Sequence, residues 1–347
     1  MKNLELFITK AWQQQSAWLT ALAPLAWLYG RVSDAKKQQY QSGKKPSYKA
    51  SVPVLVIGNI TVGGSGKTPL IIALVRYLQA KQIKVGVISR GYGGQAQKMP
   101  CLVDLYSTPD LVGDEPCLIV QNTVHQGAGV PMAVGANRQA AIELLQQHYP
   151  QIELILSDDG LQHYALARDD EWIVVDAMRG FGNGKLLPQG FLREPIERLN
   201  GATVIYHDSE VGHYPSDALT MYLSAGELEP LLGSASDNPP TTDTPVYAMS
   251  GIGYPQRFFG TLQTLGYQCL THSFGDHHQF VLADLLSFAD RPIIVTSKDA
   301  VKLRQLAQQS PHQIFSQIWV LPVVAVLSDA VYRRLDEFIA DFVKKQA

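Results

Sequence analysis

A glycine-rich run at residues 63–68 is the first part of this sequence whose residue types and spacing could do chemistry. Because glycine has no Cβ, several backbone N–H groups can lie close together and bind the phosphates of a nucleotide. Lys67 would then contact the β- and γ-phosphates, and the Thr68 hydroxyl would bind Mg²⁺. The strict phosphate-loop pattern has glycine at the position of Thr61, so the match is incomplete. The candidate nucleotide-binding residues are Gly63, Gly64, Ser65, Gly66, Lys67 and Thr68.

Two adjacent carboxylates, Asp158 and Asp159, end an apolar stretch at 154–160. Carboxylate oxygens are ligands that Mg²⁺ prefers, and phosphoryl-transfer enzymes use them beside the phosphates. An Asp-Gly pair after a strand is also common in ordinary turns. Only together with the glycine-rich run does this pair predict a site for a magnesium nucleotide.

Three further polar clusters have no obvious role in folding: Asp114-Glu115, Gln162-His163 and Asp276-His277-His278. A carboxylate that accepts a hydroxyl proton, with a histidine nearby, is the base arrangement expected of a kinase. The alternative is that Asp114 and Asp276 cap helices and that the histidines lie at the surface. No histidine spacing typical of a zinc site occurs.

Two other patterns fail on spacing. Gly251-Ile252-Gly253 would begin a dinucleotide-binding fingerprint, but Gln256 stands where the third glycine belongs. Residues 296–299 (TSKD) are similar to the guanine-reading element N-K-x-D of GTPases. In that element one residue separates the lysine from the aspartate, whereas in this chain the two are adjacent. We interpret both segments as strand-to-helix turns, with Asp299 as a possible cap.

The elements that must position these residues alternate between short apolar runs and helical patterns from residue 50 onward, which predicts a doubly wound parallel sheet. A second alternation follows a loop-like stretch rich in Pro, Ser and Thr. We therefore expect an α/β protein with two α/β/α sandwich units, the first a P-loop NTPase-like parallel sheet. The expected boundaries are 1–33 for an N-terminal helix, 34–210 for the nucleotide-binding unit, 211–245 for a linker and 246–347 for a second, smaller unit. The strands expected in the first unit are 52–59, 84–89, 130–134, 154–160, 172–177 and 202–207.

The N-terminal segment has the composition of an interfacial helix. Residues 11–30 carry no charge, and they contain Trp12, Trp18 and Trp27. Glutamines and Pro24 argue against a membrane span, whereas indole rings favour the headgroup level and the basic residues that follow favour anionic lipid. A helix docked on the protein core remains an equal alternative, and a signal peptide is a weaker one because no small-residue cleavage site follows.

Composition excludes several classes of protein. The chain has 347 residues, of which 46% are hydrophobic and 17% charged, so it can bury two cores and is not disordered. Residues 1–50 hold eight basic and two acidic side chains, and the remainder is acidic in balance, so no nucleic-acid-binding surface is expected. Three separated cysteines without a C-x-x-C pair fit a reducing compartment.

Taken in order, the motifs resemble those of the tetraacyldisaccharide 4′-kinase family, the lipid A 4′-kinases of Gram-negative bacteria. The resemblance extends from the N-terminal helix to about residue 303, and it accounts for Thr61 because the loop of this family opens with Gly58-Asn59 instead. Ser297 and Phe191 depart from the family pattern, where Glu and Pro are expected. The motifs that carry the resemblance are GN-x-x-x-GGSGKTP (58–69), SRGYGG (89–94), GDEP (113–116), DDGLQH (158–163), GFGNGKLLPQG-x-LREP (180–195), SGIG-x-P-x-RFF (250–259), F-x-DHH (274–278) and T-x-KDAVKL (296–303).

The resemblance implies transfer of the ATP γ-phosphoryl group to the 4′-hydroxyl of a tetraacylated glucosamine disaccharide 1-phosphate, which gives lipid IVA. It implies a monotopic protein on the cytoplasmic face of the inner membrane, with an amphiphilic lipid disaccharide as substrate and no obligate protein partner. Asp114 and His277 would form the base dyad, and Lys67 would be a third catalytic residue. The metal and phosphate environment would comprise Thr68, Asp158, Asp159, Gln162 and His163.

A second hypothesis is a nucleotide-gated switch or assembly ATPase at the membrane. In such a protein the glycine-rich run binds nucleotide, but no small acceptor is phosphorylated. Hydrolysis without an acceptor, tied to a partner protein, would distinguish it from a kinase.

Overall fold

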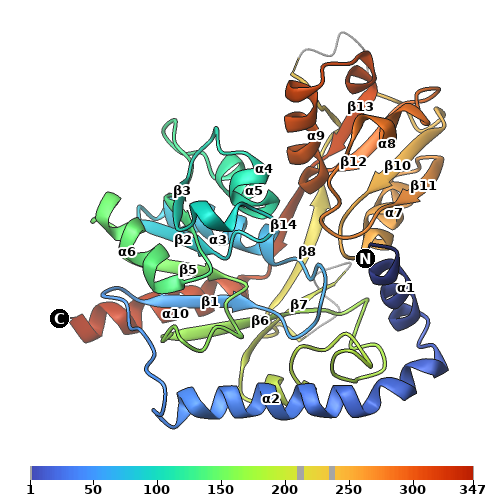
Figure 1. Ribbon diagram of the computed structural model, residues 1–347. Helices are drawn as coiled ribbons and strands as arrows, with labels where there is room; N and C mark the ends of the chain where they lie inside the picture. Colours follow the sequence, from blue (N-terminus) through green and yellow to red (C-terminus); the bar gives the residue numbers. More distant parts are fainter. Residues whose placement is uncertain (1, 209–214, 234–238, 347) are drawn as a thin grey trace.

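Two mixed α/β units, each built around its own sheet, make up the chain in the computed structural model (Figure 1). The structure describes residues 2–208, 215–233 and 239–346. The units stand side by side, and a pair of antiparallel strands runs between them.

The first unit contains a nine-stranded sheet in the order β14-β8-β7-β6-β1-β5-β2-β4-β3. All neighbouring strands are parallel except β3 with β4 and β14 with β8. The predicted strands of this unit therefore exist, within a few residues of the expected bounds. The strands are β1 (Val54–Gly58), β2 (Val85–Ser89), β3 (Cys101–Val103), β4 (Met132–Val134), β5 (Leu154–Asp158), β6 (Asp170–Asp176), β7 (Thr203–His207), β8 (Thr220–Ala225) and β14 (Val323–Leu327).

Both faces of this sheet are covered, which explains why its central strand is apolar throughout. In β1, Leu55 and Ile57 point into the core beneath α3, α5 and α10, whereas Val54 and Val56 point into the core beneath α6. All four side chains are fully buried or nearly so. The helices of the unit are α3 (Lys67–Ala80), α4 (Pro109–Val112), α5 (Asp114–Asn122), α6 (Arg138–His148) and α10 (Asp329–Gln346), with 3₁₀ turns at Ala96–Lys98 and Ile196–Leu199.

The second unit contains a five-stranded sheet in the order β11-β10-β12-β13-β9, parallel except for β9. Helices α8 and α9 contribute to the core on one face, and α7 contributes to the core on the other. The elements are β9 (Glu229–Pro230), β10 (Val246–Ser250), α7 (Pro255–Thr264), β11 (Cys269–Ser273), α8 (Leu282–Leu286), β12 (Ile293–Thr296), α9 (Ser297–Gln309), a 3₁₀ turn (Gln313–Gln317) and β13 (Ile318–Leu321).

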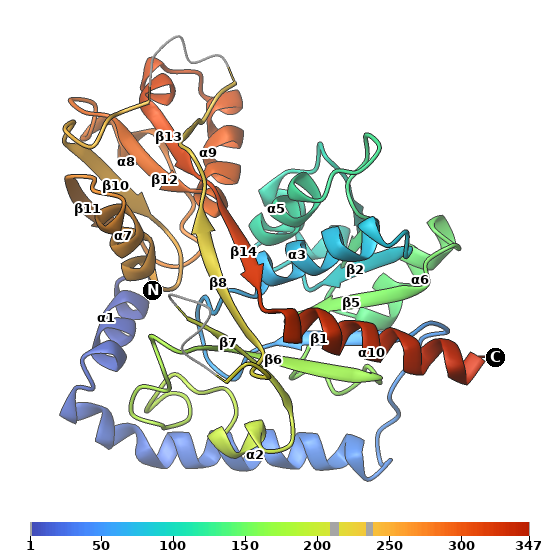
Figure 2. The ribbon, with the colours of Figure 1, turned by 180° about the vertical axis from the view of Figure 1, so that it is seen from behind.

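The end of the chain differs from the expected division at residues 246–347. Pro322 separates β13 from β14, because proline cannot donate to the strand ladder. Strand β14 pairs with β8 in the first sheet, and α10 buries Val331 and Leu335 in the first core. The segment 211–245, expected as a linker, holds β8 and β9, while 211–214 and 234–238 lie outside the described residues. The antiparallel ribbon β8–β14 therefore joins the units (Figure 2).

The N-terminal segment folds as α1 (Lys2–Gln13), a 3₁₀ turn (Ala17–Leu22) and α2 (Ala23–Gln41), so its last helix ends at residue 41 rather than near 33. Helix α2 runs along the outside of the first unit (Figure 1). Trp12 donates to the carbonyl of Pro188, and Tyr29 donates to that of Arg193. None of the described helices combines the length and the apolar composition needed to cross a membrane.

Candidate active site

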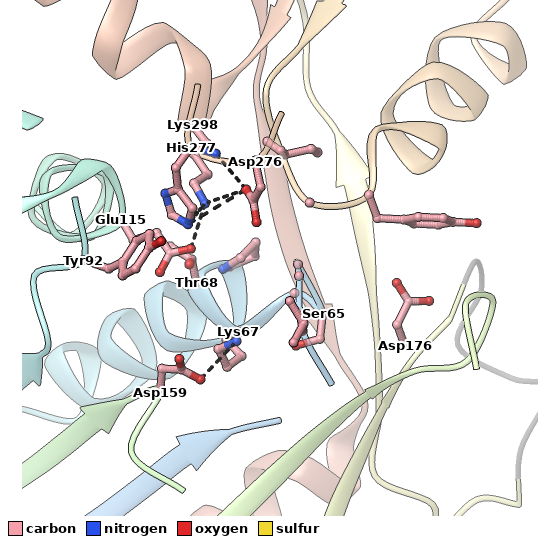
Figure 3. A pocket seen from close by; sticks show the side chains of 18 of the residues that line it. Ser65, Lys67, Thr68, Tyr92, Glu115, Asp159, Asp176, Asp276, His277 and Lys298 are labelled. Atoms are coloured by element: carbon pink, nitrogen blue, oxygen red, sulfur yellow. Dashed lines mark hydrogen bonds and ion pairs between the residues drawn. The ribbon is translucent and has the colours of Figure 1, made fainter. Parts of the chain in front are cut away.

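A cavity of about 780 Å³ lies where the two units meet (Figure 3). The glycine-rich loop and the first turn of α3 form one wall, and Gly253, Asp276 and Lys298 come from the second unit. Tyr29 and Lys36 of α2 also line the cavity. The cavity therefore connects the N-terminal helices with both sheets.

The glycine-rich loop joins the carboxyl end of β1 to the first turn of α3, as expected. Gly63 and Gly66 have φ angles of 92° and 94°, a region that favours glycine. A Cβ on Gly66 would lie 2.6 Å from Nδ1 of His207, so this position has no room for a side chain. Nδ1 of the buried His207 lies 3.0 Å from the Ser65 carbonyl oxygen, and this hydrogen bond holds the backbone of the loop in place. The helix amino terminus behind the loop is a favourable place for phosphate.

The Asn59 side chain holds the glycine-rich loop and Lys67 through hydrogen bonds. Its amide donates to Oγ1 of Thr61 and to the carbonyl of Gly63, and its Oδ1 accepts from Nζ of Lys67 at 3.1 Å. The sequence analysis gave Asn59 no separate role. Its position in the Gly58-Asn59 pair was the available signal.

Lys67 and Asp159 lie together in the cavity, with Nζ 3.4 Å from Oδ1 (Figure 3). Arg193 donates to the other carboxylate oxygen at 2.9 Å. Burial by itself raises the pKa of Asp159, but Lys67 and Arg193 outweigh it and hold this pKa well below its usual range. Asp159 has a φ of 48°, an uncommon conformation for a residue other than glycine that directs attention to a site.

Asp158 is fully buried at the end of β5. Its Oδ2 accepts from Ser89, and its Oδ1 has no hydrogen-bond partner in the described part of the chain. Burial, followed by the nearby carboxylate of Glu115, raises the pKa of Asp158 to about 7. A buried carboxylate oxygen without a partner is one that a cation could satisfy.

Gln162 and His163 lie beside the same end of β5, and both line the cavity. The Gln162 amide donates to Glu194 at 2.7 Å, and its oxygen accepts from Arg193 at 3.4 Å. Burial, and then the charge of Arg138, lower the pKa of His163 to about 4, so its imidazole is neutral at pH 7. Within the described ranges, no group of three or more His, Cys, Asp or Glu side chains is arranged to hold a metal.

Asp114 and His277 come from different units and meet at the edge of the cavity. Nδ1 of His277 lies 3.1 Å from each carboxylate oxygen of Asp114. Asp114 begins α5 and is 5% exposed, and His277 follows β11 with a φ of 54°. Burial raises the pKa of Asp114, but Lys298 and then His277 outweigh it and bring this pKa far below the usual range. Neither residue is an isolated surface residue. The structure therefore brings the predicted pair into contact.

Lys298 and Lys302 of α9 complete this charged cluster, and the sequence analysis missed both roles. Lys298 Nζ lies 2.9 Å from Oε1 of Glu115, and Lys302 Nζ lies 3.6 Å from Oδ2 of Asp114. Both lysines occur in T-x-KDAVKL, one of the motifs that carry the family resemblance, but neither was assigned a role there. Their spacing of one helical turn was the signal that both could face one partner.

The second unit also touches the glycine-rich loop directly. A Cβ on Gly253 would lie 2.7 Å from the backbone nitrogen of Gly64 and 2.8 Å from Cα of Gly63. Arg257 of α7 forms an ion pair with Asp176 at the end of β6, 2.5 Å apart. The Gly251–Gly253 turn is therefore a contact with the loop rather than part of a dinucleotide fingerprint.

This arrangement defines a class of protein: an α/β protein of two units whose charged cavity is completed by both. A family model described as tetraacyldisaccharide-1-P 4′-kinase (LpxK) matches residues 18–340. The chain belongs to this family.

Individual relatives with this family name are similar to the chain over most of its length. The tetraacyldisaccharide 4′-kinase of Psychrobacter cryohalolentis is 53% identical, with 96% of each chain covered. That of Chromobacterium violaceum is 46% identical over 92% of this chain and 94% of its own. The crystal structure of the "apo" form of LpxK from Aquifex aeolicus in complex with ATP superposes with a TM-score of 0.68 at 24% identity. It covers 93% of this chain and 99% of that one, a likeness that supports the fold.

Proposed function

We propose that this protein transfers the γ-phosphoryl group of ATP to the 4′-hydroxyl of a tetraacyl glucosamine disaccharide 1-phosphate, which forms lipid IVA in lipid A biosynthesis. The observation that carries the proposal is the Asp114–His277 pair, whose imidazole lines the same cavity as Lys67 and the glycine-rich loop. Family membership and the names of the relatives support the choice of acceptor and donor. An ATP complex of the Aquifex protein supports ATP as the nucleotide.

The glycine-rich loop would bind the triphosphate. Backbone N–H groups of 63–66 and the amino terminus of α3 would surround the phosphates, and Lys67 would contribute the charge. Lys67 already lies in the cavity on Asn59 and Asp159, from which its ammonium could reorient towards a phosphate. Phosphoryl transfer requires mainly positioning and charge stabilisation, which this wall of the cavity can supply.

Magnesium fits the carboxyl end of β5. Asp158 offers a buried oxygen without a partner, and Asp159, Thr68, Gln162 and His163 are the further candidates from the sequence. When bound, Mg²⁺ would neutralise phosphate charge as the transfer proceeds. Because Gln162 is engaged by Glu194 and Arg193, we assign it to orienting these side chains rather than to direct ligation.

The acceptor hydroxyl would lose its proton to the Asp114–His277 dyad. The 4′-oxygen forms a bond to the γ-phosphorus, the bond from that phosphorus to the β,γ-bridging oxygen breaks, and the hydroxyl proton passes to the Asp114 carboxylate. Nδ1 of His277 lies 3.1 Å from both oxygens of that carboxylate and would fix its orientation. Kinases use an aspartate in this role, and its low basicity suffices because the transfer is largely dissociative.

The acceptor is amphiphilic, so we also propose that the N-terminal segment lies in the cytoplasmic surface of the inner membrane. Six large apolar side chains of this segment are exposed, and basic side chains follow them along α2. The large apolar side chains exposed on this segment are Phe7, Trp18, Leu25, Trp27, Leu28 and Val32.

The decisive experiment incubates the purified, folded protein in detergent with the disaccharide 1-phosphate acceptor and magnesium ATP, and detects product by mass spectrometry. We expect one added phosphate per acceptor and ADP formation that depends on the acceptor. ATP hydrolysis without phosphorylation of the acceptor would favour the switch or assembly ATPase and contradict the kinase.

A further inference from the structure

Lys298 occupies a position that its own helix disfavours. It is the second residue of α9, where the positive end of the helix dipole repels a cation. Its side chain is only 16% exposed, yet three carboxylates surround its ammonium. Nζ lies 2.9 Å from Glu115, 3.8 Å from Asp276 and 4.0 Å from Asp114. Carboxylates, two of them from the first unit, therefore keep a cation at this point.

The same ammonium lies against the imidazole of the proposed dyad. Lys298 Nζ is 3.4 Å from Nε2 of His277 (Figure 3). Although burial lowers the pKa of Lys298, its carboxylate neighbours, Glu115 first, raise it well above the ordinary value. The side chain is therefore an ammonium, and an ammonium has hydrogens to donate but no acceptor.

This restricts where the imidazole can carry its proton. An N–H at Nε2 would face the N–H groups of Lys298, whereas a bare Nε2 can accept from them. The proton must then reside on Nδ1, which lies 3.1 Å from both oxygens of Asp114. The other groups facing the ring are the Asp276 carboxylate, 3.9 Å from Nε2, and the ring of Tyr92, 4.8 Å away between centroids.

We propose that Lys298 is a positioning residue, which holds His277 as the neutral tautomer that donates from Nδ1 to Asp114. This inference rests on the proposed function for its catalytic meaning, but not for its geometry. Because Lys298 and His277 come from the second unit and Asp114 and Glu115 from the first, the correct tautomer is set only when the units are closed on each other.

Lys302 provides the matched comparison. It lies one turn further along α9, 3.6 Å from Asp114, and it pairs with Asp299 at 3.3 Å. No contact joins it to His277 among the described interactions. Removing Lys302 thus removes a charge beside Asp114 without removing the donor to Nε2.

The test is nitrogen NMR of the full-length protein labelled with ¹⁵N-histidine, in which the His277 signals are assigned by their loss in His277→Gln. In the wild type at neutral pH we expect a protonated Nδ1 and a bare Nε2. Lys298→Met, which keeps the stem and removes the donor, should move His277 towards the Nε2–H tautomer or the imidazolium. Lys298→Arg, which can only donate, and Lys302→Met should both keep the wild-type tautomer.

Kinetics give a second readout. Lys298→Met should lower kcat about tenfold or more with an unchanged KM for ATP, and Lys298→Arg should recover most of that loss. A wild-type Nε2–H, or a folded Lys298→Met protein with the wild-type tautomer, would overturn the inference. If Lys298→Met does not fold, the wild-type and Lys298→Arg spectra still decide. A wild type with the expected tautomer that does not phosphorylate the acceptor would count against the proposed function alone.

Discussion

Nδ1 of His277 lies 3.1 Å from both carboxylate oxygens of Asp114, although 163 residues separate the two along the chain. If Asp114 accepts the hydroxyl proton, Asp114→Asn should lower kcat about 100-fold or more, because the amide keeps the shape but not the basicity. The KM for ATP should change little. Steady-state kinetics with varied ATP and saturating acceptor measure both quantities.

Asp290→Asn is the control for Asp114→Asn, since Asp290 is exposed and pairs only with its neighbour Arg291 in the described interactions. A wild-type kcat in Asp114→Asn, or an equal loss in Asp290→Asn, contradicts the assigned role.

Lys67 supplies the charge that the glycine-rich loop offers to phosphate. Lys67→Ala should cost about 3 kcal/mol of transition-state stabilisation, or on the order of 100-fold in kcat/KM. Asp159 keeps Arg193 as a partner, so the variant should still fold. Lys84→Ala, a substitution of an exposed lysine before β2, should leave kcat/KM unchanged. Comparable kcat/KM values for the two variants would refute the role of Lys67.

Gly253 touches the glycine-rich loop, so Gly253→Ala should hinder closure of the second unit. The new Cβ would lie 2.7 Å from the Gly64 nitrogen, closer than van der Waals contact allows. We expect lower kcat/KM, measured at several ATP concentrations. Gly260→Ala on α7 is the matched control: its Cβ would meet open space, and alanine should stabilise the helix by about 0.5–1 kcal/mol. Full activity in Gly253→Ala would mean that the close contact is not needed.

His207 makes stability depend on pH. Burial, and then the guanidinium of Arg257, lower its pKa from 6.5 to about 4. Between these values the unfolded chain binds a proton that the folded protein excludes, so folded stability is lost as the pH falls through this window. His207→Gln stays neutral and can still donate to the Ser65 carbonyl.

Between pH 7 and pH 4, we expect the unfolding free energy of His207→Gln to fall less than that of the wild type. The difference should be on the order of 1 kcal/mol. Urea unfolding at a series of pH values measures this. His125→Gln changes an exposed histidine and should follow the wild type. An identical pH dependence in His207→Gln and wild type would exclude His207 as the group responsible.

Trp27 and Leu28 are 67% and 53% exposed on α2. If α2 lies in a membrane surface, the double substitution Trp27→Ser, Leu28→Ser should weaken binding to vesicles that contain anionic lipid about tenfold or more, because two apolar side chains no longer leave water. Co-sedimentation measures it. Leu270→Ser with Leu286→Ser, which removes two exposed side chains from the second unit, should bind as the wild type does. Equal losses of vesicle binding in both double variants would mean that α2 is not the part of the protein that contacts the membrane.

The sequence by itself determined the local parts of this protein. The apolar run of β1, the glycine-rich loop and α3 could be predicted together, because strand periodicity, glycine conformation and helix pattern are properties of neighbouring residues. The acidic end of β5 followed for the same reason. The pairing of Asp114 with His277 came from family resemblance, since nothing near either residue specifies the other.

Only the tertiary structure decided what lies between the units. Strand β14 and α10 return to the first sheet, because β8 offers an edge to pair with and the first core buries Val331 and Leu335. Lys298 reaches Glu115 and His277 for a related reason: its charge is unfavourable at the start of its own helix and is stabilised by carboxylates that the other unit presents. Long-range pairings of this kind depend on how two folded surfaces meet, which local patterns do not encode.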